Sequence, residues 1–110
     1  MPTYTKNSIV LIKYPFSDLS GSKVRPAIVV NAPHISHDAL IVPLTSKTSN
    51  LLNGEFILTE WNKAGLNVET AVKRGVYTIL ESLVIKQIGE LENSDAEALE
   101  QSLRHWLGLP

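Results

Sequence analysis

Short apolar runs separated by turn-forming residues dominate the first two thirds of the chain. Runs of this kind, rich in Val and Ile, are typical of β-strands. The predicted strands cover residues 9–14, 27–30, 39–42, 55–58, parts of 71–78, and 84–88. Pro15 and Pro43 are expected to end the first and third of them. Residues 27–30 are apolar on both faces, which predicts a central strand, and the polar segments 16–23 and 31–37 are expected to be loops.

The last segment changes to a helical period. Ser94 and Glu97 have the spacing of a capping box, and Gly108 stands where a helix C-cap belongs. One apolar stripe follows at helical spacing, formed by Leu99, Leu103, Trp106 and Leu107. A single helical turn closed by glycine is expected at residues 61–65. The pattern therefore predicts a mainly β fold, a small closed or nearly closed barrel with a C-terminal α-helix.

Length and composition narrow the class further. A chain of 110 residues fits one domain, expected to span residues 1–110. The chain has no cysteine, which excludes disulfides, thiolate metal sites and cysteine nucleophiles. The N-terminus lacks the layout of a signal peptide, and no apolar run reaches the roughly 20 residues that cross a bilayer. We therefore expect a soluble, cytoplasmic protein with no membrane association.

The net charge of −1 is unevenly distributed. Residues 1–78 carry eight basic and five acidic residues, whereas residues 79–110 carry two and six. This asymmetry allows a basic functional face followed by an acidic element. The acidic residues of the segment 79–110 are explained equally well as the solvated surface of a helix.

The histidines are the first candidates for acid–base chemistry. His34 and His37 flank a loop turn, and with Asp38 they would give a metal-dependent hydrolase whose activity EDTA abolishes. Solvated loop histidines are the simpler interpretation, and His105 is expected on the helix surface. The sequence contains no zinc-protease, P-loop or dinucleotide-binding motif.

Arg25 is a more informative candidate, because Pro26 follows it directly. Proline fixes its own φ and pushes the preceding residue toward an extended conformation. A guanidinium held in this way at the mouth of a strand can bind a phosphate through two parallel donors. The alternative is a surface ion pair with a nearby carboxylate such as Asp18.

Several segments resemble one known family in the same order along the chain. Residues 9–12, residues 15–30 with the motif VRP, and residues 40–46 with the motif PLTS resemble the opening of the MazF/PemK-like toxins. Trp61 with residues 64–66, Thr78-Ile79 and the closing residues 106–109 continue the resemblance. It covers most of the chain, and its specificity lies in the ordered combination, because either motif alone would be weak. Asn7-Ser8 departs from the Gly-Asp that is common in relatives.

The resemblance implies an SH3-like β-barrel of about six to seven short strands with a C-terminal α-helix, usually a homodimer. It implies a sequence-specific, metal-independent endoribonuclease without a cofactor, an mRNA interferase that cleaves single-stranded RNA and inhibits growth. A cognate antitoxin protein would cover the same groove. The catalytic residues of the family correspond to Arg25 and Thr45. A further basic residue of some members falls at Lys73 or Arg74.

These assignments suit the chemistry of RNA cleavage. Arg25 can stabilise developing charge and is also the candidate acid, and Thr45 can donate to a phosphate oxygen, while no residue is assigned as general base. The expected RNA-binding residues are Phe16, Lys23, Ser46, Lys47, Lys73 and Arg74. Phe16 could stack on a base or anchor its loop, and Ser46 could contact RNA or satisfy a turn. A non-catalytic binding module of the same barrel class is the alternative, since fold alone does not decide function.

Overall fold

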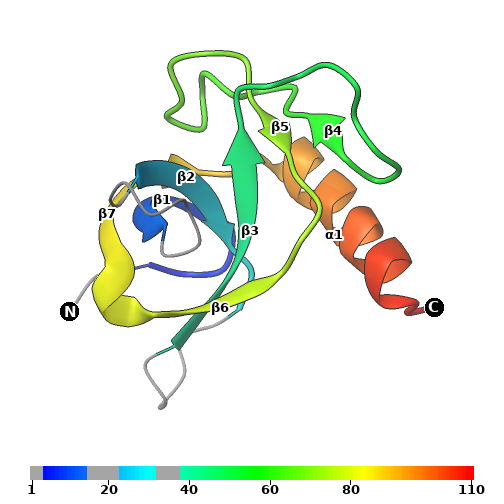
Figure 1. Cartoon of the computed structure of the whole chain (residues 1–110). Helices are drawn as coiled ribbons and strands as arrows, with labels where there is room; N and C mark the ends of the chain where they lie inside the picture. Colours follow the sequence, from blue (N-terminus) through cyan, green and yellow to red (C-terminus); the bar gives the residue numbers. More distant parts are fainter. Residues whose placement is uncertain (1–3, 15–22, 32–37) are drawn as a thin grey trace.

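The computed structural model describes residues 4–14, 23–31 and 38–110, which form a curved antiparallel sheet and a C-terminal helix (Figure 1). The order across the sheet is β4-β5-β3-β2-β1-β7, and β6 pairs with β3. The elements are β1 (Ser8–Tyr14), β2 (Lys23–Val29), β3 (Asp38–Thr45), β4 (Phe56–Ile57), β5 (Ala71–Val72), β6 (Tyr77–Leu80), the 3-10 turn η1 (Glu81–Leu83), β7 (Val84–Glu90) and α1 (Asn93–Leu107). The predicted fold class, mainly β with a C-terminal helix, is confirmed.

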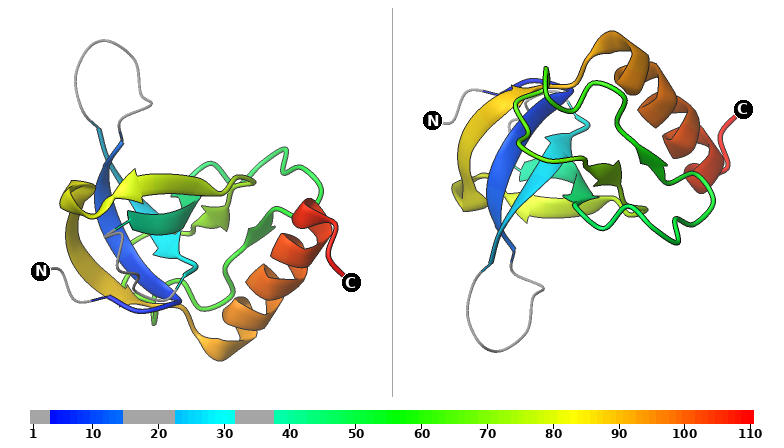
Figure 2. Two further views of the ribbon diagram at one scale, coloured as in Figure 1. Left: turned by 90° about the horizontal axis from the view of Figure 1, so that it is seen from below. Right: turned by 90° about the horizontal axis from the view of Figure 1, so that it is seen from above.

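Both faces of the central strands are buried, which explains why their sequences are apolar without alternation. Successive residues of these strands point to opposite faces of the sheet and so belong to two separate hydrophobic clusters. One, the barrel core, is enclosed by the curved strands and includes Val10, Ile12, Ala27, Val29 and Ile41. The other, the helix-side core, includes Ile9, Ile28, Val42, Leu58 and Leu99, with Leu103 and Trp106 packed against it. Figure 2 shows α1 lying along one side of the sheet, beside β4.

Pro43 does not end the third strand, contrary to the sequence prediction. β3 continues through it to Thr45. On one edge β3 pairs with β6 as far as Ile41 and with β5 from Leu44 onward, so Pro43 lies between the two pairings. The Pro43 carbonyl accepts a hydrogen bond from the Lys73 N–H at 3.0 Å. Proline has no N–H to donate, but its nitrogen faces the same edge of β3, where the sheet requires no donor from this residue.

The second strand begins earlier than predicted. β2 starts at Lys23 because the long β1 pairs with it down to Tyr14 opposite Lys23. The fourth strand is shorter than predicted, at Phe56–Ile57. The turn predicted over residues 61–65 is confirmed, with Ala64 N–H donating to the Glu60 carbonyl at 3.1 Å.

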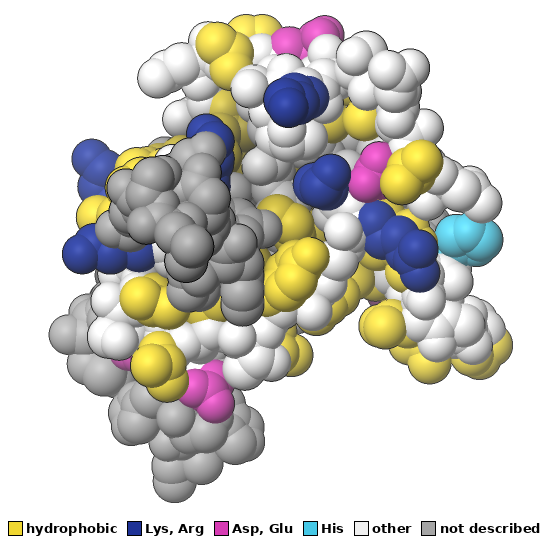
Figure 3. Space-filling view, viewed as in Figure 1, with side chains coloured by type: hydrophobic (Ala, Val, Ile, Leu, Met, Phe, Trp, Pro, Cys, Tyr) yellow, Lys and Arg dark blue, Asp and Glu magenta, His cyan; other side chains and the backbone are white. Residues whose placement is uncertain are grey.

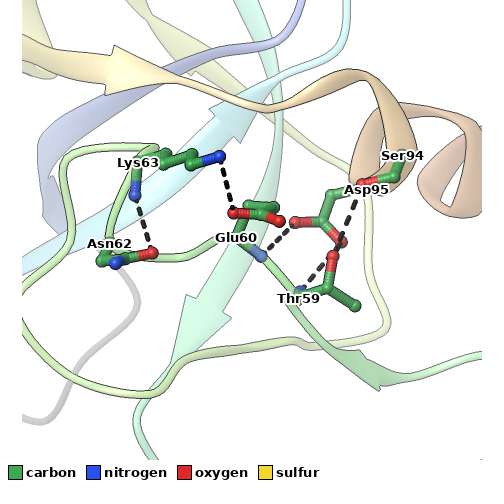
Figure 4. A network of polar contacts seen from close by, with 6 residues as sticks. All are labelled: Thr59, Glu60, Asn62, Lys63, Ser94 and Asp95. Carbon is green, nitrogen blue, oxygen red and sulfur yellow. Dashed lines mark hydrogen bonds and ion pairs between the residues drawn. The ribbon is translucent and has the colours of Figure 1, made fainter.

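The start of the helix is also different from the prediction. Glu92 is the N-cap and makes no side-chain capping bond, so the capping box predicted at Ser94 and Glu97 is wrong. Asp95, buried in the first turn, instead accepts hydrogen bonds from Thr59 N–H and Oγ1–H, both at 2.9 Å, and from Glu60 N–H at 3.0 Å (Figure 4). A tertiary contact therefore fixes this end of the helix.

The other end of the helix follows the sequence pattern more closely. Gly108 is left-handed, with φ 69°, and caps the helix as predicted. Trp106 packs on the helix-side core and donates from Nε1 to the Asn53 carbonyl at 3.0 Å. Leu107 is 58% exposed and lies outside the apolar stripe that was predicted to include it. His105 is exposed, as expected, with Nε2 3.1 Å from Asn53 Nδ2.

Candidate active-site groove

An open groove of about 660 Å³ crosses the sheet from β7 to the end of β3. The segment that connects the 61–65 turn to β5 forms one wall. The described lining consists of Leu11, Arg25, Pro26, Leu44, Thr45, Ser46, Lys47, Gly65, Leu66, Asn67, Val68, Thr70, Lys73, Lys86 and Ile88. Five of the eight residues expected to cleave or bind RNA therefore lie in one hollow, namely Arg25, Thr45, Ser46, Lys47 and Lys73.

Strand register explains why Arg25 and Thr45 lie together. Ala27 pairs with Pro43 and Ile28 with Val42. The pairing ends there, and the same register continued by two residues points Arg25 of β2 toward Thr45 of β3, in agreement with the place of both residues in one groove. Strands of one sheet lie about 4.8 Å apart, so side chains in such a pair can contact one group.

The Thr45 hydroxyl is oriented by its own loop. Thr45 Oγ1 accepts a hydrogen bond from the Lys47 N–H at 3.1 Å. A hydroxyl has one donor and two acceptor positions, so its proton can still be donated to a bound group. Thr45 is partly exposed at the groove, where that donor can reach a ligand.

Close backbone contact builds the wall at the β7 side. A Cβ atom on Gly65 would collide with the Ile88 carbonyl oxygen, and one on Gly89 would collide with the Ala64 carbonyl oxygen. Gly65 also has φ +94°, which side chains disfavour. The two glycines therefore let the 61–65 turn dock on β7 and bring Leu66 next to Ile88 in the groove.

A second contact joins the two loops at the opposite rim. Thr48 Oγ1 donates to Glu69 Oε1 at 3.3 Å and links the loop after β3 to the segment before β5. Nearby, the buried Thr70 donates from Oγ1 to the Val68 carbonyl at 2.8 Å. These bonds hold the rim residues in place around the groove.

Positive charge distinguishes this groove from the other hollows. Its described lining has four cationic side chains, Arg25, Lys47, Lys73 and Lys86, and no carboxylate. Two smaller recesses beside α1, of about 230 and 320 Å³, each include glutamates, such as Glu97 and Glu90. Figure 3 shows Lys and Arg side chains gathered on the upper part of the face seen there. Of these three hollows in the described part of the chain, the groove is best suited to a polyanion.

Lys73 and Arg74, which the sequence could not distinguish, differ in their position relative to the groove. Lys73 lines the groove, whereas Arg74 is not among the lining residues, although its side chain is exposed. The Arg74 N–H donates to Glu55 Oε2 at 2.8 Å, and the Leu52 N–H donates to Glu55 Oε1 at 2.7 Å. These two bonds, with smaller help from the charges of Lys73 and Arg74, lower the pKa of Glu55.

Some predicted residues cannot be placed. Phe16, Asp18, His34 and His37 lie outside the described residues, and the side chain of Lys23 is not described although its backbone opens β2. Within the described ranges, no group of three or more His, Asp or Glu residues could hold a metal ion.

The sequence alone missed Lys86. It stands in a predicted strand, but no local pattern marks it, because its place in the groove depends on the pairing of β7 with β1. Asn67 and Thr70 were missed for the same reason, since their segment folds over the sheet through the contacts of Gly65.

Comparison with known proteins identifies the family. The model of the family described as "PemK-like, MazF-like toxin of type II toxin-antitoxin system" matches residues 5–107. The chain belongs to this toxin family. A search of curated proteins finds no match.

Solved structures of MazF-like toxins share the fold of this chain at low sequence identity. The MazF-mt6 toxin of Mycobacterium tuberculosis superimposes with a TM-score of 0.75 at 22% identity, covering 94% of this chain and 98% of that one. A mycobacterial endoribonuclease in complex with its cognate antitoxin gives 0.78 at 15% identity, covering 98% of each chain. A MazE-MazF structure from Deinococcus radiodurans gives 0.77 at 16% identity, with 97% and 98% covered. The resemblance inferred from the sequence is thus confirmed for family and fold.

One further property concerns membranes. In the part of this PemK/MazF-like toxin that the structure describes, no helix is long and apolar enough to cross a bilayer.

Proposed function

We propose that this PemK/MazF-like toxin is a sequence-specific endoribonuclease that cleaves single-stranded RNA and thereby inhibits growth. The observation that carries the proposal is the juxtaposition of Arg25 and Thr45 in a groove whose described lining is cationic. A polyanion is attracted to such a groove, and the pair supplies directed donors at one point within it.

The reaction follows from the groups that meet there. The 2′-hydroxyl of the RNA attacks the adjacent phosphorus and loses its proton to solvent. The bond to the 5′-oxygen of the next nucleotide breaks, and that oxygen takes a proton from solvent, which leaves a 2′,3′-cyclic phosphate and a 5′-hydroxyl. Negative charge accumulates on the phosphoryl oxygens in between. The Arg25 guanidinium binds two of these oxygens and stabilises that charge, and its fixed position beside Pro26 limits the reorganisation required.

Thr45 acts on the same phosphate. Because its oxygen already accepts the Lys47 N–H, the hydroxyl proton is directed outward and donates to a phosphoryl oxygen. Lys47 and Lys73 bind the RNA through their charges, and Ser46 adds a polar contact. The charge that a divalent ion could balance is met by side chains, so we propose that cleavage is metal-independent.

Regulation and assembly are carried over from the family. One similar structure is an endoribonuclease with its cognate antitoxin, and another is a MazE-MazF structure. We propose that a cognate antitoxin covers the cationic groove of this chain, that the toxin is a cytoplasmic homodimer, and that it needs no cofactor.

Incubation of the purified protein with a mixture of single-stranded RNAs in EDTA tests the proposal. We expect cuts restricted to a short sequence, mapped by sequencing of the new 5′ ends. An absence of cuts with retained RNA or protein binding would favour the non-catalytic binding module. Cuts that EDTA abolishes would favour a metal-dependent hydrolase.

A further inference from the structure

Lys86 lies in the groove but on the far side of β1 from the pair Arg25 and Thr45. It pairs with Leu11 of β1, and Leu11 pairs in turn with Pro26 of β2. All three residues line the groove. The row Lys86, Leu11, Pro26 therefore forms a continuous strip of the groove floor that ends beside Arg25.

The spacing of this strip separates Lys86 from the reacting phosphate. Strands lie about 4.8 Å apart, so β7 lies roughly 10 Å from β2 and roughly 14 Å from β3 along the sheet. One phosphate held between Arg25 and Thr45 is thus too far for Lys86 to share as a close contact. Between the two positions lie the half-buried side chains of Leu11 and Pro26, an apolar surface.

We propose that Lys86 binds the phosphate next to the scissile one, while the nucleoside between the two phosphates rests on Leu11 and Pro26. This inference rests on the proposed function. Alternation of a cationic group, an apolar platform and a second cationic group matches the alternation of phosphate and nucleoside in single-stranded RNA. The RNA then crosses the sheet from β3 over β1 to β7, and Lys86 is a substrate-binding residue outside the catalytic pair.

The side chain of Lys86 is exposed, so its replacement leaves no cavity and the fold should persist. Lys86→Ala should raise KM about three- to tenfold for an RNA oligonucleotide spanning a mapped cleavage site, with kcat little changed. Lys86→Arg should restore KM. Lys13→Ala is the matched control, because Lys13 is exposed on neighbouring β1 but does not line the groove, and it should leave both constants unchanged.

A modified substrate makes the test specific for one phosphate. Two oligonucleotides carry a neutral methylphosphonate, one on the 5′ side and one on the 3′ side of the scissile phosphate. With the wild type, one of the two modified oligonucleotides should raise KM by the same factor as the Lys86→Ala substitution does. With the Lys86→Ala variant, that oligonucleotide should give the same KM as the unmodified RNA. For a 2′-deoxy analogue that cannot be cut, Lys86→Ala should also reduce the salt dependence of log Kd by about 0.7.

The outcomes separate the two proposals. If the wild type fails to cut the unmodified RNA, the proposed function fails. The Lys86 assignment is wrong, while the function stands, in two cases in which the wild type does cut. In the first, KM of the Lys86→Ala variant is unchanged. In the second, the increases in KM caused by Lys86→Ala and by each methylphosphonate multiply.

Discussion

Glu55 shows how a single residue can support the site without touching it. Its carboxylate joins the N–H groups of Leu52 and Arg74 and so ties the loop before β4 to the residues that follow β5, where Lys73 enters the groove. A carboxylate that accepts two backbone bonds is favoured in its charged form, in line with its lowered pKa.

Glu55→Gln should lower the free energy of unfolding at neutral pH by about 1 kcal/mol, because an amide cannot accept both bonds at this site. Since the folded pKa of Glu55 lies below its ordinary value of 4.5, the stabilisation is complete above that value and is lost as pH falls through the folded pKa. Urea denaturation from pH 7 to pH 3 measures the difference. A difference between the two proteins that stays constant over this range would contradict the assignment.

Sequence predicted Arg25 and Thr45 through a family resemblance, and the structure gives the physical reason for their proximity. Spacing along the chain could not, because the two residues are 20 positions apart and their place in one groove depends on the register of β2 with β3. Lys86 could not be predicted for the same reason, because its place in the groove depends on the register of β7 with β1. The sequence could not distinguish Lys73 from Arg74, because which of the two lines the groove depends on the course of the chain after β5.

At the scale of elements, the helix was predicted well because its signals are local. The apolar stripe from Leu99 to Trp106 and the glycine cap need no tertiary information. The helix start was predicted wrongly, because Asp95 bonds to Thr59 and Glu60 from elsewhere in the chain. Pro43 misled the prediction of β3 for the same reason: whether a proline ends a strand depends on which neighbours that strand has.

The contact at Asp95 yields an element-scale prediction. Asp95 is 1% exposed, and its two carboxylate oxygens accept from different backbone N–H groups, so Asp95→Asn would place an amide N–H₂ against one of these donors in a buried site. We expect a loss of about 3 kcal/mol in the free energy of unfolding, measured by urea denaturation. Glu97→Gln is the matched control in the same helix, where the side chain is exposed, and it should change stability by less than about 0.5 kcal/mol. A loss as small as that of Glu97→Gln would show that Asp95 does not hold the helix.

At the scale of the whole molecule, the curved sheet collects residues from four strands and three connecting segments into one groove. Leu44, Leu66 and Ile88 of its lining also belong to the helix-side core or pack against it, so the groove and α1 share one face of the sheet. The acidic residues in the last third of the sequence lie largely on the helix and around its start, away from the groove. The uneven charge seen in the sequence thus corresponds to two separate surfaces.

The homodimer proposed from the family is also a property at this scale. The exposed apolar side chains of Leu80 and Ile85 flank η1, and a second copy that covers such side chains would gain stability. Sedimentation equilibrium at micromolar concentration should give twice the chain's 12.1 kDa. A mass of one chain at that concentration would contradict the dimer.

The proposed cleavage depends most on Arg25 and Thr45, which would bind the scissile phosphate. Both residues lie at the groove surface, so Arg25→Ala and Thr45→Ala should retain the circular dichroism spectrum and thermal unfolding of the wild type.

The most direct test is single-turnover cleavage of one RNA oligonucleotide, spanning a mapped cut site, by the wild type and these two variants in EDTA. We expect the rate constant to fall about 10²- to 10³-fold in each variant, the typical loss when one preorganised donor is removed from a developing charge. Folded variants that cleave at the wild-type rate would contradict the central claim.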